Sequence, residues 1–477
     1  ISFLLSLHLW FNFDSSTADL QMVERIPWIT QFNIEYFLGL DGLNLFFFLI
    51  ITFITPLALL GSWNVAKRNW QFQIQMLLLQ IGMLGCFAAM DVVLFYVFFE
   101  VMLVPMYLLI GIWGGPNRLY ATIKFFIYTM LGSLLMLISL LYTANIYLDL
   151  NRAWSFSVLD WYGMQIPPET QFWLFLGFAA AFAVKIPLFP LHTWLPDAHY
   201  EAPTAGSVQL AAVMLKFGPY GFLRFAMPIF PAAVFDLTPI FMVLALIGII
   251  YGGLVAMVQP QIKRLIAYSS VAHMGYIVLG LFALNIQGLS GSWIQMINHA
   301  IVTGALFLTV GMIYERTHTQ EISAYGGVAH TMPKFAVFLV FFSMASIGLP
   351  GLNGFVGEVL TMIGAARVNI SYGIVAAFGV LVAAIYMLWM VQRVIFGPLT
   401  KDLVKNLNDF SLREVVVLVP LVFWTIFLGV YPQPFFERIE VSINHYIEMI
   451  KNQEPRFAQK EAESSGLEKF LAWNLSE

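Results

Sequence analysis

The chain has 477 residues, of which 60% are hydrophobic and only 10% are charged, and its formal net charge at pH 7 is −4. Apolar runs of about 20 residues recur from end to end, and each is long enough to cross the membrane as a helix. We expect an all-α polytopic membrane protein, because these runs are continuously apolar and lack the alternation of a membrane barrel.

Cysteine usage and motifs limit the cofactors that this chain could carry. Cys86 is the one cysteine in the sequence and lies in an apolar run. It excludes a disulfide framework and leaves too few thiolates for an iron–sulfur cluster held by this chain alone. We find no P-loop, no dinucleotide-binding glycine motif and no haem attachment motif. We therefore expect no cofactor or metal here, and ion movement driven by energy from elsewhere.

The first predicted unit, residues 1–71, holds a partial helix, an outer loop and one span. The opening run ISFLLSLHLWF is too short to span, so we expect it to be the end of a helix whose beginning is missing. A polar loop is expected over residues 14–35. Twelve fuller spans follow at 40–61, 72–90, 92–111, 119–147, 171–196, 204–228, 238–258, 264–284, 292–314, 334–366, 370–395 and 412–431.

Ten of these spans form two sets of five, over residues 72–228 and 238–395, followed by a last span in 396–431. The fourth member of each set is interrupted, at Lys185-Ile186-Pro187 in the first and at the sequence LPGLNG in the second. Because five is odd, the second set enters from the opposite side, as in transporters with inverted repeats and discontinuous helices. Pro and Gly are also common in membrane helices, so the matched breaks could be a coincidence.

Residues 432–477 are predicted to form an amphipathic helix and a polar tail. Phe436, Ile439, Ile443, Ile447 and Ile450 recur at three- and four-residue spacing. We expect this helix to lie along the membrane surface or a neighbouring subunit.

Lysine and arginine are unevenly shared between alternate loops. One side carries Arg25, Arg152 and Arg367, and the other carries Lys67, Arg68, Arg118, Lys263, Arg264, Arg316, Lys334, Arg393, Lys401, Lys405 and Arg413. The richer side is assigned to the cytoplasm, or to the matrix of an organelle. The C-terminal helix is then expected on the outer side.

Four charged side chains fall deep inside predicted spans: Glu100, Lys185, Lys216 and Glu358. A charge there costs about 2.5–3.5 kcal/mol on insertion scales, so it normally faces a partner or a water-filled path. We predict that these side chains transfer protons, with Glu100 steadying the ammonium of Lys185. Alternatively, Glu100 could make a structural hydrogen bond, and Glu358 could cap the half-helix after the second break.

His273 and His299 lie on two successive predicted spans. A lone histidine on an apolar helix is usually a satisfied core residue, but two in this place could relay protons. A metal site is disfavoured, because no cluster of Cys, Asp or Glu accompanies them.

Polar residues near the cytoplasmic span ends are expected to anchor the chain at the interface. Asp197 and His199 could also line an access route for protons. The set comprises Lys124, Asp197, His199, Lys263 and Arg264.

Several long motifs together identify a family. They are FYVFFEVMLVPMYLLIGIWGG, KFFIYT, FAVKIPLFPLHTWLPDAHYEAPTAGSVQLAAVMLKFGPYGFLRF, IKRLIAYSSVAHMGY and LPGLNGFVGE. With these motifs the chain resembles, over essentially its whole length, the antiporter-like membrane subunits of respiratory complex I. At Glu358 the chain resembles the M-type branch of that family, because the sister subunits and the related antiporter subunits generally carry lysine at this position.

The resemblance implies about fourteen helices in the full protein, two inverted five-helix repeats and a proton route along a central polar axis. It implies that Glu100 pairs with the pumping lysine Lys185, and that Lys216 is the connecting lysine. His273 and His299 match relay positions, and Glu358 matches the terminal carboxylate leading outward. The implied partners are the other membrane subunits of complex I, including neighbouring antiporter-like subunits, with protons as the transported ion.

The resemblance also implies the setting. We expect the bacterial inner membrane ahead of the mitochondrial one, and a non-redox, proton-pumping role within NADH:quinone oxidoreductase. Two other functions stay open from the residues. One is a subunit of a multi-subunit Na⁺/H⁺ antiporter or a membrane-bound hydrogenase, and the other is a structural spacer whose charges are packing pairs.

Overall fold

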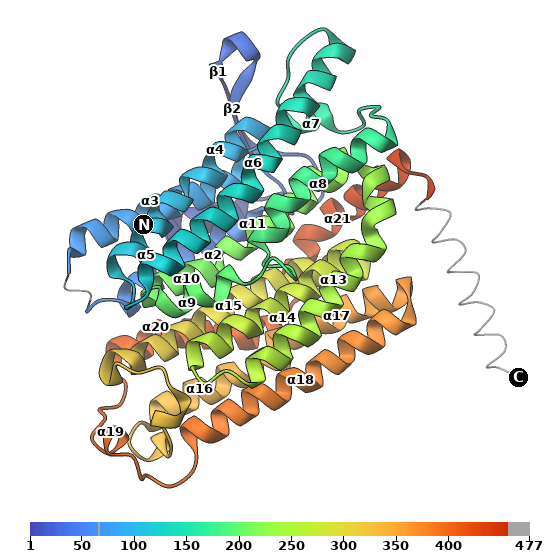
Figure 1. Ribbon diagram of the computed structural model, residues 1–477. Coiled ribbons are helices and arrows are strands. Elements are labelled where there is room, and N and C mark those ends of the chain that lie inside the picture. Colours follow the sequence, from blue (N-terminus) through green and yellow to red (C-terminus); the bar gives the residue numbers. More distant parts are fainter. Residues whose placement is uncertain (65–66, 457–477) are drawn as a thin grey trace, which may run out of the picture.

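The computed structural model describes residues 1–64 and 67–456, which form one bundle of helices with a small hairpin at one end (Figure 1). The part of the predicted C-terminal tail beyond residue 456 lies outside the described residues. Eight helical segments of the described chain are long and apolar enough to cross a membrane. They are α3 (Asn69–Ala88), α4 and α5 together (Val92–Val101 and Leu103–Trp113), α6 (Arg118–Asn151), α13 (Pro231–Met257), α14 (Ile262–Phe282), α15 (Ile286–Thr317), α18 (Ile370–Ile395) and α20 (Leu412–Val430).

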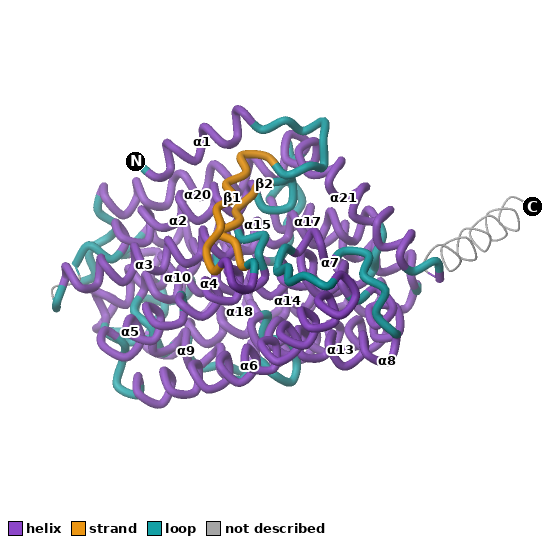
Figure 2. The backbone as a smooth tube through the Cα atoms, turned by 90° about the horizontal axis from the view of Figure 1, so that it is seen from above, coloured by secondary structure: helices purple, strands orange, loops and turns teal. Residues whose placement is uncertain are grey.

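The remaining predicted spans fall on shorter or interrupted helices. The span at 40–61 is α2 (Leu45–Gly61), and the partial helix at the start is α1 (Ser2–Asn12), which lies at the edge of the bundle (Figure 2). The other elements are α7 (Val158–Trp161), α8 (Pro168–Lys185), α9 (Trp194–Glu201), α10 (Thr204–Ala212), the 3₁₀ turn η2 (Met214–Lys216), α11 (Phe217–Gly221), the π-helical turn η3 (Phe222–Ala226), α12 (Met227–Ile229), α16 (Pro333–Ser346), α17 (Asn353–Val368), α19 (Asp402–Lys405) and α21 (Gln433–Gln453).

Both predicted breaks are present. Helix α8 ends at Lys185, two residues before Pro187, and the chain becomes helical again at Trp194. Helix α16 ends at Ser346 and α17 begins at Asn353. In this second break Gly348 and Gly351 have φ of 81° and 89°, a left-handed conformation that glycine adopts at little cost. The breaks therefore follow from the local Pro and Gly residues.

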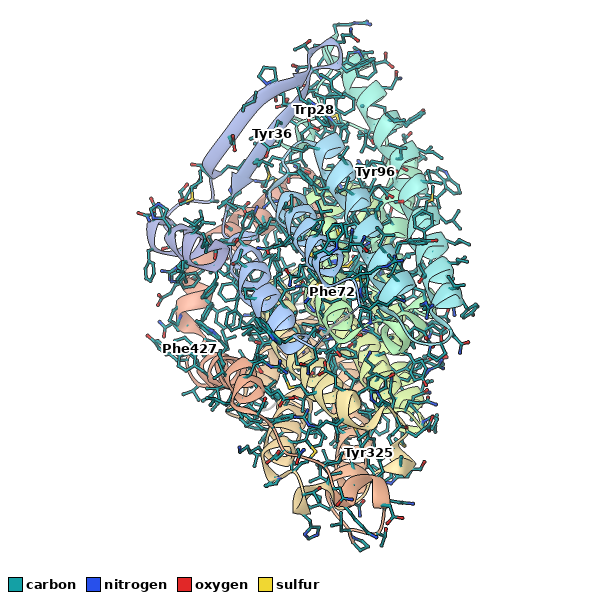
Figure 3. All side chains as sticks on the ribbon, turned by 90° about the vertical axis from the view of Figure 1, so that its left-hand side faces the viewer. Trp28, Tyr36, Phe72, Tyr96, Tyr325 and Phe427 are labelled. Atoms are coloured by element: carbon teal, nitrogen blue, oxygen red, sulfur yellow. The ribbon has the colours of Figure 1, made fainter. Side chains whose placement is uncertain are left out.

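The all-α prediction is wrong at one place, because residues 21–40 form a β-hairpin where the sequence analysis expected a loop. Strand β1 (Gln21–Ile29) pairs antiparallel with β2 (Ile34–Leu40), in a register that sets Arg25 opposite Phe37. Arg25 also binds Glu35 across the strands at 2.6 Å. The charges in this segment hid the alternation of β2, whose Phe37 is buried. Figure 3 shows the hairpin projecting beyond the helical body.

The amphipathic helix is confirmed as α21, but the structure places its apolar face against the chain's own bundle. Ile439, Ile443 and Ile450 are buried as predicted. Phe435 packs against Phe46 with ring centroids 4.8 Å apart, and the Ser442 hydroxyl accepts a hydrogen bond from a backbone amide of residue 42. That the helix also lies along the membrane surface or a neighbouring subunit stays a prediction. The residue pattern defined the face but carried no information about which surface it covers.

Helices α14 and α15 form the centre of the bundle. In their apolar windows 94% and 100% of the residues are buried, against 33% to 56% in the other candidate spans. The outer helices keep apolar faces exposed, as expected for contact with lipid or other subunits. The two central helices carry His273 and His299, so these histidines lie far from lipid.

Asp91 ties the hairpin to the bundle at the start of α4. Its carboxylate accepts hydrogen bonds from the amides of Val93 and Leu94 at 2.9 and 3.0 Å, and from the amide of Glu35 in β2 at 3.0 Å. Asp91 directly precedes the membrane-spanning segment and is buried. One side chain thus caps α4 and holds β2.

Replacing Asp91 with asparagine is expected to reduce the pH dependence of stability. Burial raises the pKa of Asp91 from 3.8 to about 6. The folded chain then binds this proton more tightly than the unfolded chain, so the free energy of unfolding falls as the pH rises through that interval. Thermal unfolding of the purified complex at several pH values in this range measures how steeply its stability changes with pH. The control is Asp149→Asn, at an exposed position. An Asp91→Asn variant with the wild-type slope would contradict the assignment.

Candidate functional site

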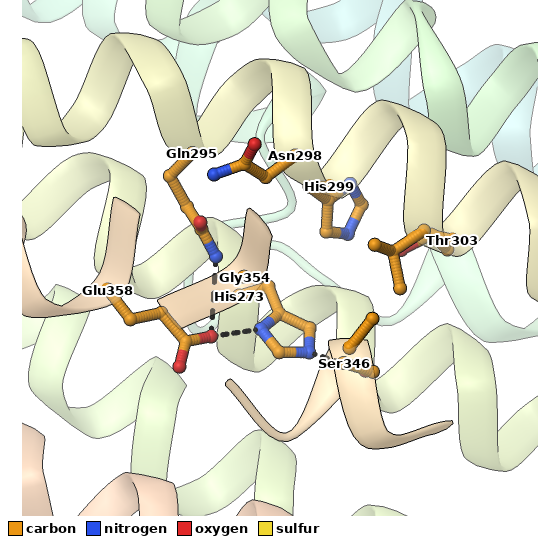
Figure 4. A pocket seen from close by; sticks show the side chains of 10 residues that line it. His273, Gln295, Asn298, His299, Thr303, Ser346, Gly354 and Glu358 are labelled. Atoms are coloured by element: carbon orange, nitrogen blue, oxygen red, sulfur yellow. Dashed lines mark hydrogen bonds and ion pairs between the residues drawn. The ribbon is translucent and has the colours of Figure 1, made fainter. Parts of the chain in front are cut away.

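A polar cavity lies at the centre of the bundle, between α14, α15 and the break that separates α16 from α17 (Figure 4). It has room for about one water molecule. The cavity is built where two central helices face a stretch of backbone that is not helical. Its lining residues are His273, Gln295, Asn298, His299, Val302, Thr303, Ala345, Ser346, Gly354 and Glu358.

Glu358 and His273 form a hydrogen-bonded pair on one side of this cavity. Glu358 Oε1 lies 2.9 Å from His273 Nδ1 and also accepts from Gln295 Nε2 at 3.3 Å. The other ring nitrogen of His273 lies 3.1 Å from the hydroxyl of Ser346, the last residue of α16. The Glu358 side chain is 3% exposed. Leu352, the N-cap residue of α17, makes no side-chain cap hydrogen bond, and the Glu358 carboxylate is bonded to His273 and Gln295 instead of capping the helix.

Lys216 and His299 form a second pair. Lys216 Nζ lies 2.7 Å from His299 Nδ1 and donates to the Ala211 carbonyl at 2.5 Å. Helix α10 ends at Ala212 and the chain continues as a 3₁₀ turn, which leaves the Ala211 carbonyl free to accept this bond. Lys216 is 1% exposed, so its ammonium does not snorkel to an interface.

The two pairs adjoin through their histidines. The ring centroids of His273 and His299 are 5.8 Å apart. In the described chain, His299 Nε2 has no hydrogen-bond partner, whereas both nitrogens of His273 are engaged. The structure therefore places Lys216, His299, His273 and Glu358 in one contiguous row.

Glu100 and Lys185 stand apart from this row and from each other. Lys185 Nζ lies 4.7 Å from the ring centroid of Phe99 and makes no hydrogen bond in the described part of the chain. Glu100 Oε1 is likewise without a partner there. The part of the chain that the structure describes thus shows no ion-pair contact between Glu100 and Lys185.

The description "NADH:quinone oxidoreductase/Mrp antiporter, TM" belongs to a family model that matches residues 89–385. The chain is 46% identical to NADH-quinone oxidoreductase subunit M of Rhodobacter capsulatus, covering 94% of this chain and 88% of that protein. It is 42% identical to NADH-ubiquinone oxidoreductase chain 4 of Arabidopsis thaliana, covering 94% and 90%. The chain belongs to this family. The resemblance inferred from the motifs, including its M-type branch, is confirmed.

Solved structures agree with the family assignment. A chain of respiratory complex I from Thermus thermophilus with bound NADH superimposes with a TM-score of 0.87 and 33% identity, covering 94% of this chain and 93% of that one. A chain of the Mrp complex from Dietzia sp. DQ12-45-1b has a TM-score of 0.80 at 19% identity, with 94% and 92% covered, which shows a shared fold.

Two residues that the sequence analysis treated as interfacial anchors are in fact buried. His199 stacks on Phe307 with ring centroids 4.5 Å apart, and Lys263 donates to the Ala202 carbonyl at 2.7 Å. Their position near the ends of predicted spans suggested contact with water. The signal that could have corrected this is the break at residues 186–193, which carries the following helix back into the bundle.

The other residues that were expected to anchor the chain at the interface lie where that expectation places them, partly exposed and paired. Asp197 binds Lys124 at 2.8 Å and Arg264 at 3.1 Å, and all three side chains are partly exposed.

His192, which the sequence analysis did not single out, lies in the break at residues 186–193. It is buried, and neither of its ring nitrogens is hydrogen-bonded in the described chain. Among residues 1–64 and 67–456, no three His, Cys, Asp or Glu side chains converge as a metal site.

Proposed function

We propose that this chain is the M-type membrane subunit of a NADH:quinone oxidoreductase and translocates protons across the membrane, driven by electron transfer in other subunits. The observation that carries the proposal is the contiguous row of Lys216, His299, His273 and Glu358 in the most buried part of the bundle. Each of the four side chains can hold or accept a proton, which an apolar side chain at the same position could not do.

The proposed route begins at Lys185. Electron transfer elsewhere changes the electrostatic interaction between Glu100 and Lys185, and Lys185 passes its proton toward Lys216. From there the proton moves through His299 and His273 to Glu358, which releases it outward. A buried lysine suits this role because its ammonium changes protonation state readily when its surroundings change. This subunit contributes translocation only, and carries no redox step of its own.

We further propose an architecture of about fourteen helices in the full protein, with inverted five-helix repeats at 72–228 and 238–395. The paired breaks after Lys185 and after Ser346 support it, because each interrupts the fourth span of its set. The predicted units 1–71, 396–431 and 432–477 flank the repeats.

The proposed setting is a bacterial inner membrane, with the other membrane subunits of the complex as partners, among them neighbouring antiporter-like subunits. The 46% identity to a bacterial subunit M supports it. The alternative of a Na⁺/H⁺ antiporter or hydrogenase subunit is less favoured: the family model also covers Mrp antiporters, but the solved Mrp chain is only 19% identical, against 46% for the bacterial subunit M.

Replacing Lys185 with alanine tests the function directly. In the intact complex, reconstituted into proteoliposomes, Lys185→Ala is expected to remove this subunit's share of NADH-driven proton pumping, because alanine cannot take up or release the proton with which the proposed route begins. Native gel electrophoresis controls for assembly, and Glu100→Ala is expected to act in the same direction. Full pumping by an assembled Lys185→Ala complex would refute the role.

A further inference from the structure

A second buried ion pair lies further along the interrupted helix that carries Lys216. Arg224 Nη2 lies 2.5 Å from Asp41 Oδ2, and the two side chains are only 5% and 6% exposed. Arg224 belongs to the π-helical turn η3, and Asp41 directly follows strand β2. The proposed proton route uses neither residue, so the pair needs its own explanation.

Four elements meet at this pair. Asp41 Oδ1 accepts from the amide of Leu43 at 3.0 Å, at the start of α2. Arg224 Nε donates to the Tyr220 hydroxyl, which in turn donates to the carbonyl of Phe87 in α3. The hydroxyl of Tyr162, which follows α7, donates to the Arg224 carbonyl at 2.8 Å. The π-helical turn is thus attached to the surrounding bundle at both its side chain and its backbone.

Helix α21 covers the pair. The amide of Gly42, next to Asp41, donates to the Ser442 hydroxyl at 3.2 Å. A Cβ at Gly42 would lie 2.5 Å from the carbonyl oxygen of Arg438, so α21 is in backbone contact with this turn. The helix excludes water from the pair, and breaking a buried pair of this kind leaves an uncompensated charge.

The segment between Lys216 and Arg224 is packed without free space. A Cβ at Gly218 would lie 2.6 Å from the carbonyl oxygen of Phe182 and 3.0 Å from the amide nitrogen of Ile186. Helix α11 therefore rests directly on the last turn of α8, beside Lys185. A displacement at either end of this segment has to reach the other end, because the backbones are already in contact.

The winding of the segment sets where Lys216 points. The chain passes from a 3₁₀ turn at Lys216, through α11, to a π-helical turn at Arg224. If the π-helical turn relaxed by one residue to α-helical winding, the residues before it would rotate about the helix axis by roughly 100°. The Lys216 ammonium would then leave His299.

We propose that the Arg224–Asp41 ion pair positions Lys216 against His299 by holding the π-helical turn in place. The inference rests on the proposed role of Lys216 in proton transfer. Arg224 and Asp41 are then positioning residues. They act by holding Lys216 in place and do not themselves bind the transferred proton.

The test measures protons pumped per NADH oxidised in proteoliposomes that hold the whole complex, normalised to assembled complex. Arg224→Gln and Asp41→Asn each break the pair with little change of volume. Either is expected to lose most of this subunit's pumping in the wild-type background, and neither is expected to add a loss when Lys216→Ala is already present. A general structural defect of the complex would also reduce the pumping that remains in the Lys216→Ala background, and that result would overturn the inference.

Two further variants keep the test decisive if breaking the pair prevents assembly. Tyr162→Phe removes the bond to the Arg224 carbonyl, and Gly218→Ala pushes α11 away from α8. Each leaves the ion pair intact and is expected to reduce pumping only when Lys216 is present. Wild-type pumping by both variants would contradict the inference.

The matched control is Glu414→Gln, which weakens the Arg316–Glu414 ion pair, with its contacts of 2.6 and 2.7 Å, between α15 and α20. Pumping by this variant is expected to be unchanged, and a loss equal to that of Arg224→Gln would overturn the inference. Full pumping by Lys216→Ala alone would instead refute the proposed function. A loss in Lys216→Ala with none in Arg224→Gln would refute only the positioning role.

Discussion

Replacing Lys216 with alanine is expected to slow proton transfer through this chain by roughly 10²–10⁴-fold, the usual contribution of a positioned proton donor or acceptor. The Lys216 ammonium contacts His299 from the interrupted helix, and the Ala211 carbonyl fixes it there. The measurement is NADH-driven pumping by the intact complex in proteoliposomes. The pumping that remains is that of the neighbouring antiporter-like subunits.

Lys216→Arg separates proton transfer from charge packing. The guanidinium keeps the positive charge but does not release a proton in proteins. If Lys216 carries protons, the arginine variant is expected to fail as badly as the alanine variant. If Lys216 is only a packing charge, arginine restores pumping, and that outcome would refute the role assigned to it.

Replacing Glu358 with glutamine is the second change expected to have a large effect. The glutamine carbonyl can still accept from His273 and Gln295, so the packing of α17 on α14 is kept. The amide cannot take up a proton, so transfer out of the row is expected to slow as strongly as for Lys216→Ala. Pumping per NADH oxidised, in assembled complex, is again the measurement.

Glu358→Ala provides the contrast in stability. It leaves His273 and Gln295 without their acceptor, and each unsatisfied buried donor costs roughly 1–3 kcal/mol. The alanine variant is therefore expected to unfold at a lower temperature than the glutamine variant, with pumping equally low in both. Normal pumping by Glu358→Gln would show that this carboxylate does not carry the proton.

Much of this site was predictable because a charge inside an apolar run is costly and therefore conspicuous. Lys216 and Glu358 were identified in this way, and His299 and His273 because they lie on two successive spans; the structure brings the four together. Their order in space was not available from the residues, since α14 and α15 are adjacent in sequence while Glu358 reaches them from beyond the second break. The family motifs, not the spacing, supplied that link.

The misjudged residues share one physical cause. His199 and Lys263 were judged by their distance along the chain from the end of a span, whereas burial depends on what packs around them. The hairpin was missed because the charges of its segment suggested a loop, and the apolar spacing of α21 did not show which surface the helix covers. In each case the local pattern was readable, but the surface that receives it is formed by residues far away in sequence, such as Phe46 under Phe435.

Both ring nitrogens of His273 are hydrogen-bonded, and this has a consequence for how protons could pass along the row. Since Glu358 and Ser346 engage both of them, a proton on His299 has no direct acceptor on the neighbouring ring. The hydrogen bonds of the row therefore stop between His299 and His273. If the row carries protons as proposed, transfer across this gap is expected to need either a water molecule in the cavity, which has room for about one, or a turn of the imidazole.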